Sequence, residues 1–140
     1  MNRGDNAQHQ RGDERRPDPV RQAEAGARAW QAVMHAQHCA TPDHADFYNL
    51  AANLSDTLDT VAILTRVLAW QVRGYADGLG AGRVVYDDSR AGLHPVDPAR
   101  RLAHAEVELV ALSVAVETAG RRANDFWSAI GHIGVEDVRS

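Results

Sequence analysis

The chain has 140 residues, with 15 basic side chains against 19 acidic ones, a formal net charge of −4 and 44% hydrophobic residues. This length suits one domain and is short for two ordinary hydrophobic cores. The acidic balance excludes the strongly basic surface of a generic nucleic-acid-binding domain, so nucleic acid is not an expected main ligand. No apolar run approaches the roughly 18 residues of a membrane span, so no membrane partner is expected either.

Residues 1–16 form a polar N-terminal tail in which Met1 and Ala7 are the only hydrophobic residues. Such a segment cannot bury enough apolar surface to offset its ordering entropy, so we expect a disordered tail before a single domain over residues 17–136. The tail carries both charge signs and does not resemble a signal peptide. The single cysteine, Cys39, cannot form an internal disulfide. Both features predict a cytoplasmic protein.

The first helix is predicted over residues 19–39, with Pro19 at its first position, where a missing backbone N–H costs nothing. One apolar stripe recurs at steps of three and four residues and comprises Val20, Ala23, Ala27, Trp30 and Met34. The next helix is expected to start at the turn after this stripe. Its predicted N-cap is Thr41, with Pro42 as its first residue.

Two longer helices are predicted over residues 43–77 and 98–131. In each, apolar residues alternate at spacings of three and four, which is typical of the seam between two packed helices of a coiled coil. The first predicted seam comprises Phe47, Leu50, Leu54, Thr57, Val61, Leu64, Leu68, Gln71 and Tyr75. The second comprises Leu102, Ala105, Leu109, Leu112, Val116, Ala119, Ala123, Phe126 and Ile130.

The matched lengths of these two helices, about 50 Å each, favour a long antiparallel hairpin. Its predicted register brings together positions whose numbers add to about 175, so that Arg66 lies near Glu108 and Arg121 near Asp56. The shorter first helix covers only part of the hairpin. The predicted fold is therefore all-α, a three-helix, bundle-like arrangement with apolar surface left over for self-association.

The connection between the long helices covers residues 78–96 and reads GLGAGRVVYDDSRAGLHPV. It is longer than the two to eight residues usual between bundle helices. Two interpretations stay open. Residues 83–86, Arg-Val-Val-Tyr, are able to pair as a short strand or dock on a partner, whereas the glycines favour a flexible loop.

Uncommon residues gather where the second helix begins and the third helix ends. The hairpin brings these two ends together, opposite the long connection. Tyr48 and Trp127 each stand one position off the predicted seam, so the core of the hairpin does not account for them. Aromatic rings with a polar atom are favoured anchors of protein interfaces. The predicted partner-binding residues are Phe47, Tyr48, Asn49, Asn124, Trp127, Ile130 and His132.

The alternative for this aromatic end is that the first helix packs on it, with Trp30 and Met34 covering the rings. Trp127→Ala distinguishes the two cases. A core tryptophan should cost roughly 3–5 kcal/mol of stability. A tryptophan at an interface should weaken association and leave the isolated fold nearly intact.

Histidines near the end of the first helix suggest a metal-binding alternative. His35 and His38 lie one turn apart, and His44 follows the proline turn. A zinc or iron site needs three or four ligands, and none of the strong ligand spacings is present, so no metal or other cofactor is the main expectation. The sequence also holds no nucleophile triad and no phosphate-binding loop, so the protein is not expected to be an enzyme.

The main prediction for function is a non-catalytic helical interaction or adaptor protein that self-associates and presents its aromatic end to a protein partner. The first alternative is a metal-binding helical-bundle protein that uses His35, His38 and His44. The second is an accessory protein of DNA processing or of a mobile genetic element. Only the small size and the arginine-rich tail motivate that second alternative.

Overall fold

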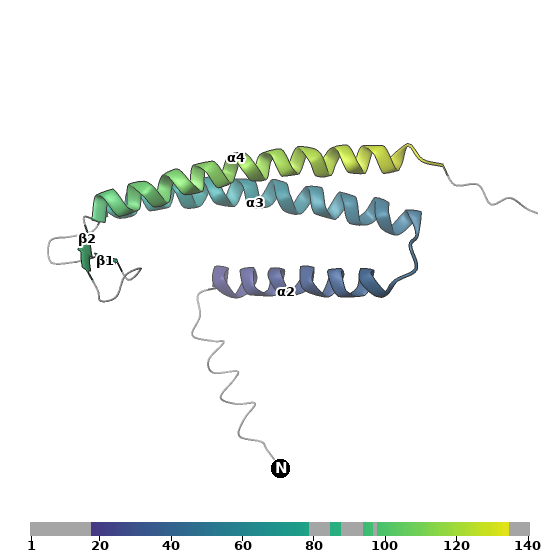
Figure 1. Cartoon of the computed structure of the whole chain (residues 1–140), viewed down its shortest axis with the longest axis horizontal. Coiled ribbons are helices and arrows are strands. Elements are labelled where there is room, and N and C mark those ends of the chain that lie inside the picture. Colours follow the sequence, from purple (N-terminus) through teal and green to yellow (C-terminus); the bar gives the residue numbers. More distant parts are fainter. Residues whose placement is uncertain (1–17, 79–84, 88–93, 97, 135–140) are drawn as a thin grey trace, which may run out of the picture. The chain divides into compact units, whose positions relative to one another are not determined.

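A computed structural model describes residues 18–78, 85–87, 94–96 and 98–134. Its helices are α2 (Asp18–Cys39), α3 (His44–Gly78) and α4 (Pro98–Gly131), shown in Figure 1. The all-helical class and the bounds of the three predicted helices are confirmed to within about one residue. The predicted tail over residues 1–16 lies outside the described residues.

The chain divides between Pro42 and Asp43 into two compact units. The first contains α2, a helix of 22 residues whose first turn is supported by an ion pair from Arg21 Nη2 to Asp18 Oδ1 at 3.2 Å. The second contains α3 and α4, of 35 and 34 residues.

Asp43 caps the N-terminus of α3. Its Oδ1 accepts a hydrogen bond from Ala45 N at 3.2 Å, and its carbonyl oxygen accepts one from Phe47 N at 3.1 Å. A side-chain oxygen that accepts from the second helical N–H, and a carbonyl that starts the helical ladder, define an N-cap residue. The expectation that Thr41 is the cap and Pro42 the first helical residue is therefore wrong by two positions.

Asp43→Ala is expected to destabilise the second unit by about 1 kcal/mol, because the cap oxygen and a negative charge at the positive end of the helix dipole are both lost. Thermal unfolding followed by far-UV circular dichroism measures the change. Thr41→Ala is the control and should leave stability nearly unchanged. A larger loss for the Thr41 variant would contradict this assignment.

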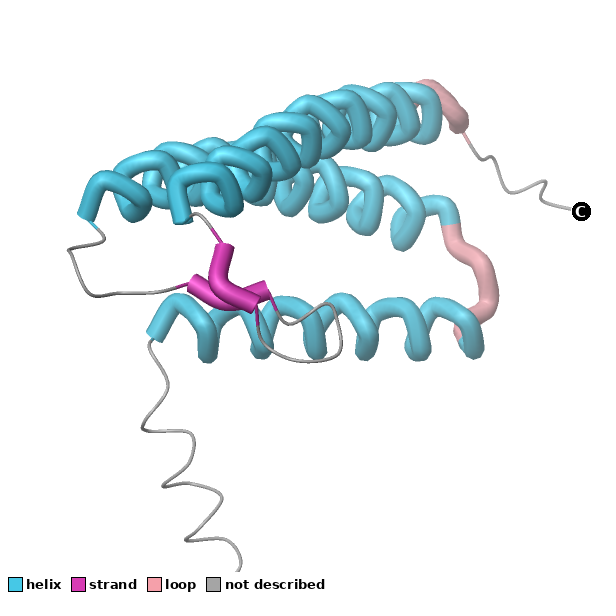
Figure 2. The backbone as a smooth tube through the Cα atoms, turned by 60° about the vertical axis from the view of Figure 1, so that its left-hand side comes forward, coloured by secondary structure: helices cyan, strands magenta, loops and turns pink. Residues whose placement is uncertain are grey.

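Helices α3 and α4 run antiparallel, side by side along their whole lengths (Figures 1 and 2). The ring of Tyr48 contacts Trp127 at one end, and Arg73 pairs with Glu106 towards the other. Between them, Arg66 pairs with Glu117, which lies more than two turns beyond the predicted partner Glu108. The antiparallel direction of the hairpin was correctly predicted and this predicted ion pair was not.

The most deeply buried residues between α3 and α4 are small ones. Ala62 is 4% exposed, whereas Leu64, in the predicted seam, is 49% exposed. The observed contact keeps the predicted alternation of three and four residues but is shifted by one position on α3. We call it the small-residue seam, and its buried members are Ala51, Ser55, Ala62, Thr65, Ala69, Ser113 and Gly120.

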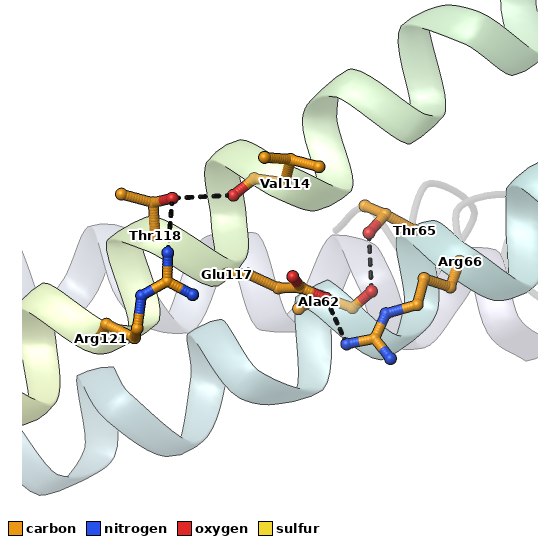
Figure 3. Close-up of polar contacts among 7 residues, drawn as sticks. All are labelled: Ala62, Thr65, Arg66, Val114, Glu117, Thr118 and Arg121. Atoms are coloured by element: carbon orange, nitrogen blue, oxygen red, sulfur yellow. Dashed lines mark hydrogen bonds and ion pairs between the residues drawn. The ribbon is translucent and has the colours of Figure 1, made fainter.

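Gly120 leaves space for side chains of the opposite helix. A Cβ placed on Gly120 would lie 3.0 Å from Asp59 Oδ1 and 3.8 Å from Leu58 Cβ. The hydroxyl of Thr65 is satisfied within its own helix, because its Oγ1 donates to the Ala62 carbonyl at 2.7 Å (Figure 3). A buried hydroxyl with a partner carries little desolvation penalty, so threonine is tolerated in this seam.

Two short strands follow α3 and precede α4 in the sequence. Strand β1 (Val85–Asp87) pairs antiparallel with β2 (His94–Val96), and Tyr86 stands opposite Pro95. The strand alternative for residues 83–86 is therefore confirmed for Val85 and Tyr86. Residues 79–84 and 88–93 of the predicted 78–96 connection lie outside the described residues.

Candidate functional site

The hairpin has two flanks, one on either side of the small-residue seam, and they differ in chemistry. The first, which we call the charged flank, contains the residues four positions after the small residues of the seam: Asp59, Arg66, Arg73, Glu117 and Asn124. Arg66 forms an ion pair with Glu117 across the helices (Figure 3). Arg73 Nε donates to Glu106 Oε1 at 2.7 Å, and this hydrogen bond and the charge of Glu106 raise the pKa of Arg73.

An open groove of about 940 Å³ lies on the charged flank, and Asp59, Arg66, Glu117 and Asn124 are among its lining residues. Acidic and basic groups alternate along it, and Arg121 Nη2 donates to Thr118 Oγ1 at 3.1 Å rather than reaching the predicted Asp56 (Figure 3). Exposed ion pairs of this kind contribute little stability.

The opposite side, which we call the apolar flank, contains the residues one position before the same small residues. In two antiparallel helices that face each other, these positions lie on one common side. They are Leu54, Val61, Leu68, Leu112 and Ala119. Four further large apolar side chains extend the flank, and all are exposed. Tyr75, Phe126 and Ile133 continue the seven-residue spacing of these positions, and Leu64 lies one turn after Val61.

The aromatic end of the hairpin is built around one ring contact. The ring centroids of Tyr48 and Trp127 lie 5.8 Å apart with an interplanar angle of 56°. This tilted geometry is one of the favourable arrangements for aromatic pairs. A Cβ on Gly131 would lie 3.2 Å from Tyr48 Cε2, so the glycine gives the tyrosine ring its space. The rings predicted to lie at the same end do meet.

Trp127 lies between the two helices, where its Nε1 is enclosed and has no hydrogen-bond partner among the described residues. Its ring is half-buried, while Tyr48 keeps 41% of its surface exposed. An enclosed indole N–H without an acceptor costs about 1–3 kcal/mol. The ring is therefore held by packing alone, and the stability it contributes is reduced by that amount.

The other predicted partner-binding residues do not share one face. Phe47 and Ile130 are half-buried, and Asn49, Asn124 and His132 are exposed. Of these, Asn124 borders the charged flank. A role for them in partner binding stays a prediction.

Phe126 is the residue that sequence reasoning missed. It was assigned to the core of the hairpin, yet 46% of its surface is exposed, while its neighbour Trp127 turns towards α3. On α4 the buried residues Ser113 and Gly120 stand one position after the predicted Leu112 and Ala119, and the same shift exchanges Phe126 for Trp127. The signal that could have revealed it is the pair of small residues Ser113 and Gly120, seven residues apart and seven before Trp127.

The histidines proposed as metal ligands come from two helices. His35 and His38 lie on α2, and His44 is the first residue of α3. Within the described ranges, no three side chains of histidine, cysteine, aspartate or glutamate are grouped closely enough to hold a metal ion. The structure therefore gives the metal-binding alternative no support.

In the part of the chain that the structure describes, no helix is both long and apolar enough to cross a lipid bilayer. Comparison with known protein families, curated proteins and solved structures finds no match to this chain. The interpretation of its function rests on the two flanks and the seam.

Proposed function

We propose that this protein is a non-catalytic helical interaction protein that self-associates through its apolar flank. The main support for this proposal is that small side chains are buried while large apolar side chains are exposed, the reverse of an ordinary hydrophobic core. The hydrophobic residues buried in the described structure are three alanines, Ala51, Ala62 and Ala69. Large apolar side chains such as Leu64, Leu68 and Tyr75 stand on the outside, between 38% and 55% exposed.

The inversion has an energetic consequence. Burying one methyl or methylene group contributes about 0.8 kcal/mol, so an alanine seam supplies far less hydrophobic free energy than a seam of leucines. A two-helix hairpin with so little buried apolar surface needs additional burial to be stable. Covering the apolar flank with another polypeptide supplies it. This requirement favours a protein whose folding and assembly are coupled.

The length of α2 also argues for assembly. Its 22 residues span about 33 Å, whereas α3 and α4 span about 50 Å. The stretch from Leu54 to Tyr75 on α3 already has the length of α2, and exposed Ile133 extends the flank further along α4, so a single helix of this length leaves part of the flank uncovered. The bundle-like arrangement of all three helices stays a prediction, and with or without it apolar surface remains for a partner.

The aromatic end adds a second element to the proposal. Phe126 and Ile133 continue the apolar flank to the end of α4, and both are exposed. Tyr48 lies nearby on α3 and keeps its hydroxyl end accessible for a polar contact. The partner surface proposed here therefore includes Phe126 and Tyr48, with Trp127 holding Tyr48 in place from inside the hairpin.

Leu64→Glu is the variant that tests this function. Because Leu64 is half-exposed in the single chain, a glutamate there should leave helix content nearly unchanged but should place a charge in the proposed interface. Sedimentation equilibrium over a hundredfold range of dilution should give a mass above 15.3 kDa for the natural chain and a shift towards that mass for the variant. The matched control is Asn53→Glu, an exposed position on the outer face of α3.

A natural chain that stays monomeric at every concentration, and unfolds with the cooperativity and stability of an ordinary domain, would contradict the proposed function. Equal effects of Leu64→Glu and Asn53→Glu would remove the apolar flank from it.

A further inference from the structure

The outer side of α4 carries a second repeat beside the one that packs on α3. These residues are again spaced by three and four, and they form the part of the apolar flank that α4 contributes. All but the first, which is half-buried, are exposed: Ala105, Glu108, Leu112, Ala115, Ala119, Arg122, Phe126, Ala129 and Ile133. A helix with two such repeats on different sides is suited to pack against two helices.

This repeat is complementary to itself when it is reversed about Ala115. To within one residue, Leu112 then lies at the level of Ala119 of a second copy, and Phe126 at the level of its Ala105. These two large side chains each lie beside an alanine, which allows close interdigitation of the two helices. In the parallel alternative, Phe126 would meet Phe126 and the alanines would meet one another, leaving gaps beside the bulky rings.

The charges of the repeat obey the same reversal. Glu108 and Arg122 stand seven residues on either side of Ala115. Neither takes part in an ion pair with any described residue. About a two-fold axis at Ala115, Glu108 of each copy meets Arg122 of the other, giving two interchain pairs. A parallel arrangement would instead set Glu108 against Glu108 and Arg122 against Arg122.

We propose that two copies of this chain associate through antiparallel α4 helices, with a two-fold axis at Ala115 and paired Glu108 and Arg122 side chains. This inference rests on the proposed function and adds the occupant, direction and register. A two-fold interface requires one surface to complement itself, and the reversed repeat meets that requirement in both size and charge. The ion pairs Arg66–Glu117 and Arg73–Glu106 belong to the charged flank, and Arg122 also lines the groove there.

Charge reversal tests the pairing. Glu108→Arg and Arg122→Glu should each place two like-charged pairs in the interface and weaken dimerisation by about tenfold or more. The double variant carrying both changes restores the opposite charges in the antiparallel register and should return to the natural dimer. An equimolar mixture of the two single variants should likewise form a heterodimer. Sedimentation velocity measures all four samples.

Cross-linking tests the axis. In a Cys39→Ser background, Ala115→Cys places one thiol of each copy at the two-fold axis, and mild oxidation should link the two chains. Ser128→Cys, on the other side of α4, is the matched control and should stay largely unlinked. The readout is the band of doubled mass on non-reducing gel electrophoresis.

The outcomes separate the two proposals. Restoration by the double variant together with linkage through position 115 supports the antiparallel dimer. A dimer that the charge reversals leave intact, or that the double variant fails to restore, overturns this interface while self-association through another face remains. A natural chain that is monomeric throughout overturns both proposals.

Discussion

Ala62→Leu is expected to destabilise the hairpin by about 1–3 kcal/mol, because the added carbon atoms have no space between α3 and α4. Ala62 is 4% exposed and lies at the middle of the small-residue seam. Relieving the overlap requires the helices to separate, and this also loosens the contacts of the neighbouring alanines. Urea unfolding at one protein concentration, followed by far-UV circular dichroism, measures the change.

The control makes the same substitution at an exposed alanine. Ala103→Leu, at an exposed position of α4 away from the apolar flank, should change stability by no more than about 0.5 kcal/mol. If leucine at position 62 were as well tolerated as leucine at position 103, the small-residue seam would not be the contact between the helices.

Trp127→Ala is expected to cost about 3 kcal/mol, the lower end of the range for truncating a core tryptophan, because the ring is half-buried. The substitution removes the contact with Tyr48 and opens the aromatic end of the hairpin. Part of the loss is returned because the enclosed indole N–H disappears with the ring. Unfolding of the variant and loss of the near-UV signal of the ring pair report this change.

Trp70→Ala is the matched control for that experiment. Trp70 is 73% exposed on α3, and its truncation should alter unfolding by less than about 0.5 kcal/mol. A Trp127 variant as stable as the Trp70 variant, but with weaker association, would assign Trp127 to the partner surface, as the sequence predicted. The result therefore decides between packing inside the hairpin and binding outside it.

The two flanks explain why one hairpin can fold specifically with so small a core. Ion pairs such as Arg66–Glu117 on the charged flank set which residues of α3 and α4 lie opposite one another, although they add little stability. In the assembly proposed above, the apolar flank would supply the hydrophobic surface that becomes buried. On that proposal, the charged flank sets the register and the apolar flank adds stability.

Much of this architecture follows from the sequence alone. The spacing of apolar residues and the capping residues predict three helices with nearly correct bounds. They also predict the relative lengths of the helices and the heptad period of α3 and α4, because these are local properties of the chain. The meeting of Tyr48 with Trp127 also follows, since it needs only two antiparallel helices of equal length.

The phase of the heptad repeat was decided by the tertiary structure. On α3, both the line of leucines and the line of small residues have the seam spacing, and hydrophobicity favours the leucines. The helices instead pack through Ala62 and its small neighbours, and Leu64 stays half-exposed. Local sequence therefore sets each helix and its period, whereas the fit between two helices selects which face is buried and leaves the large apolar residues exposed.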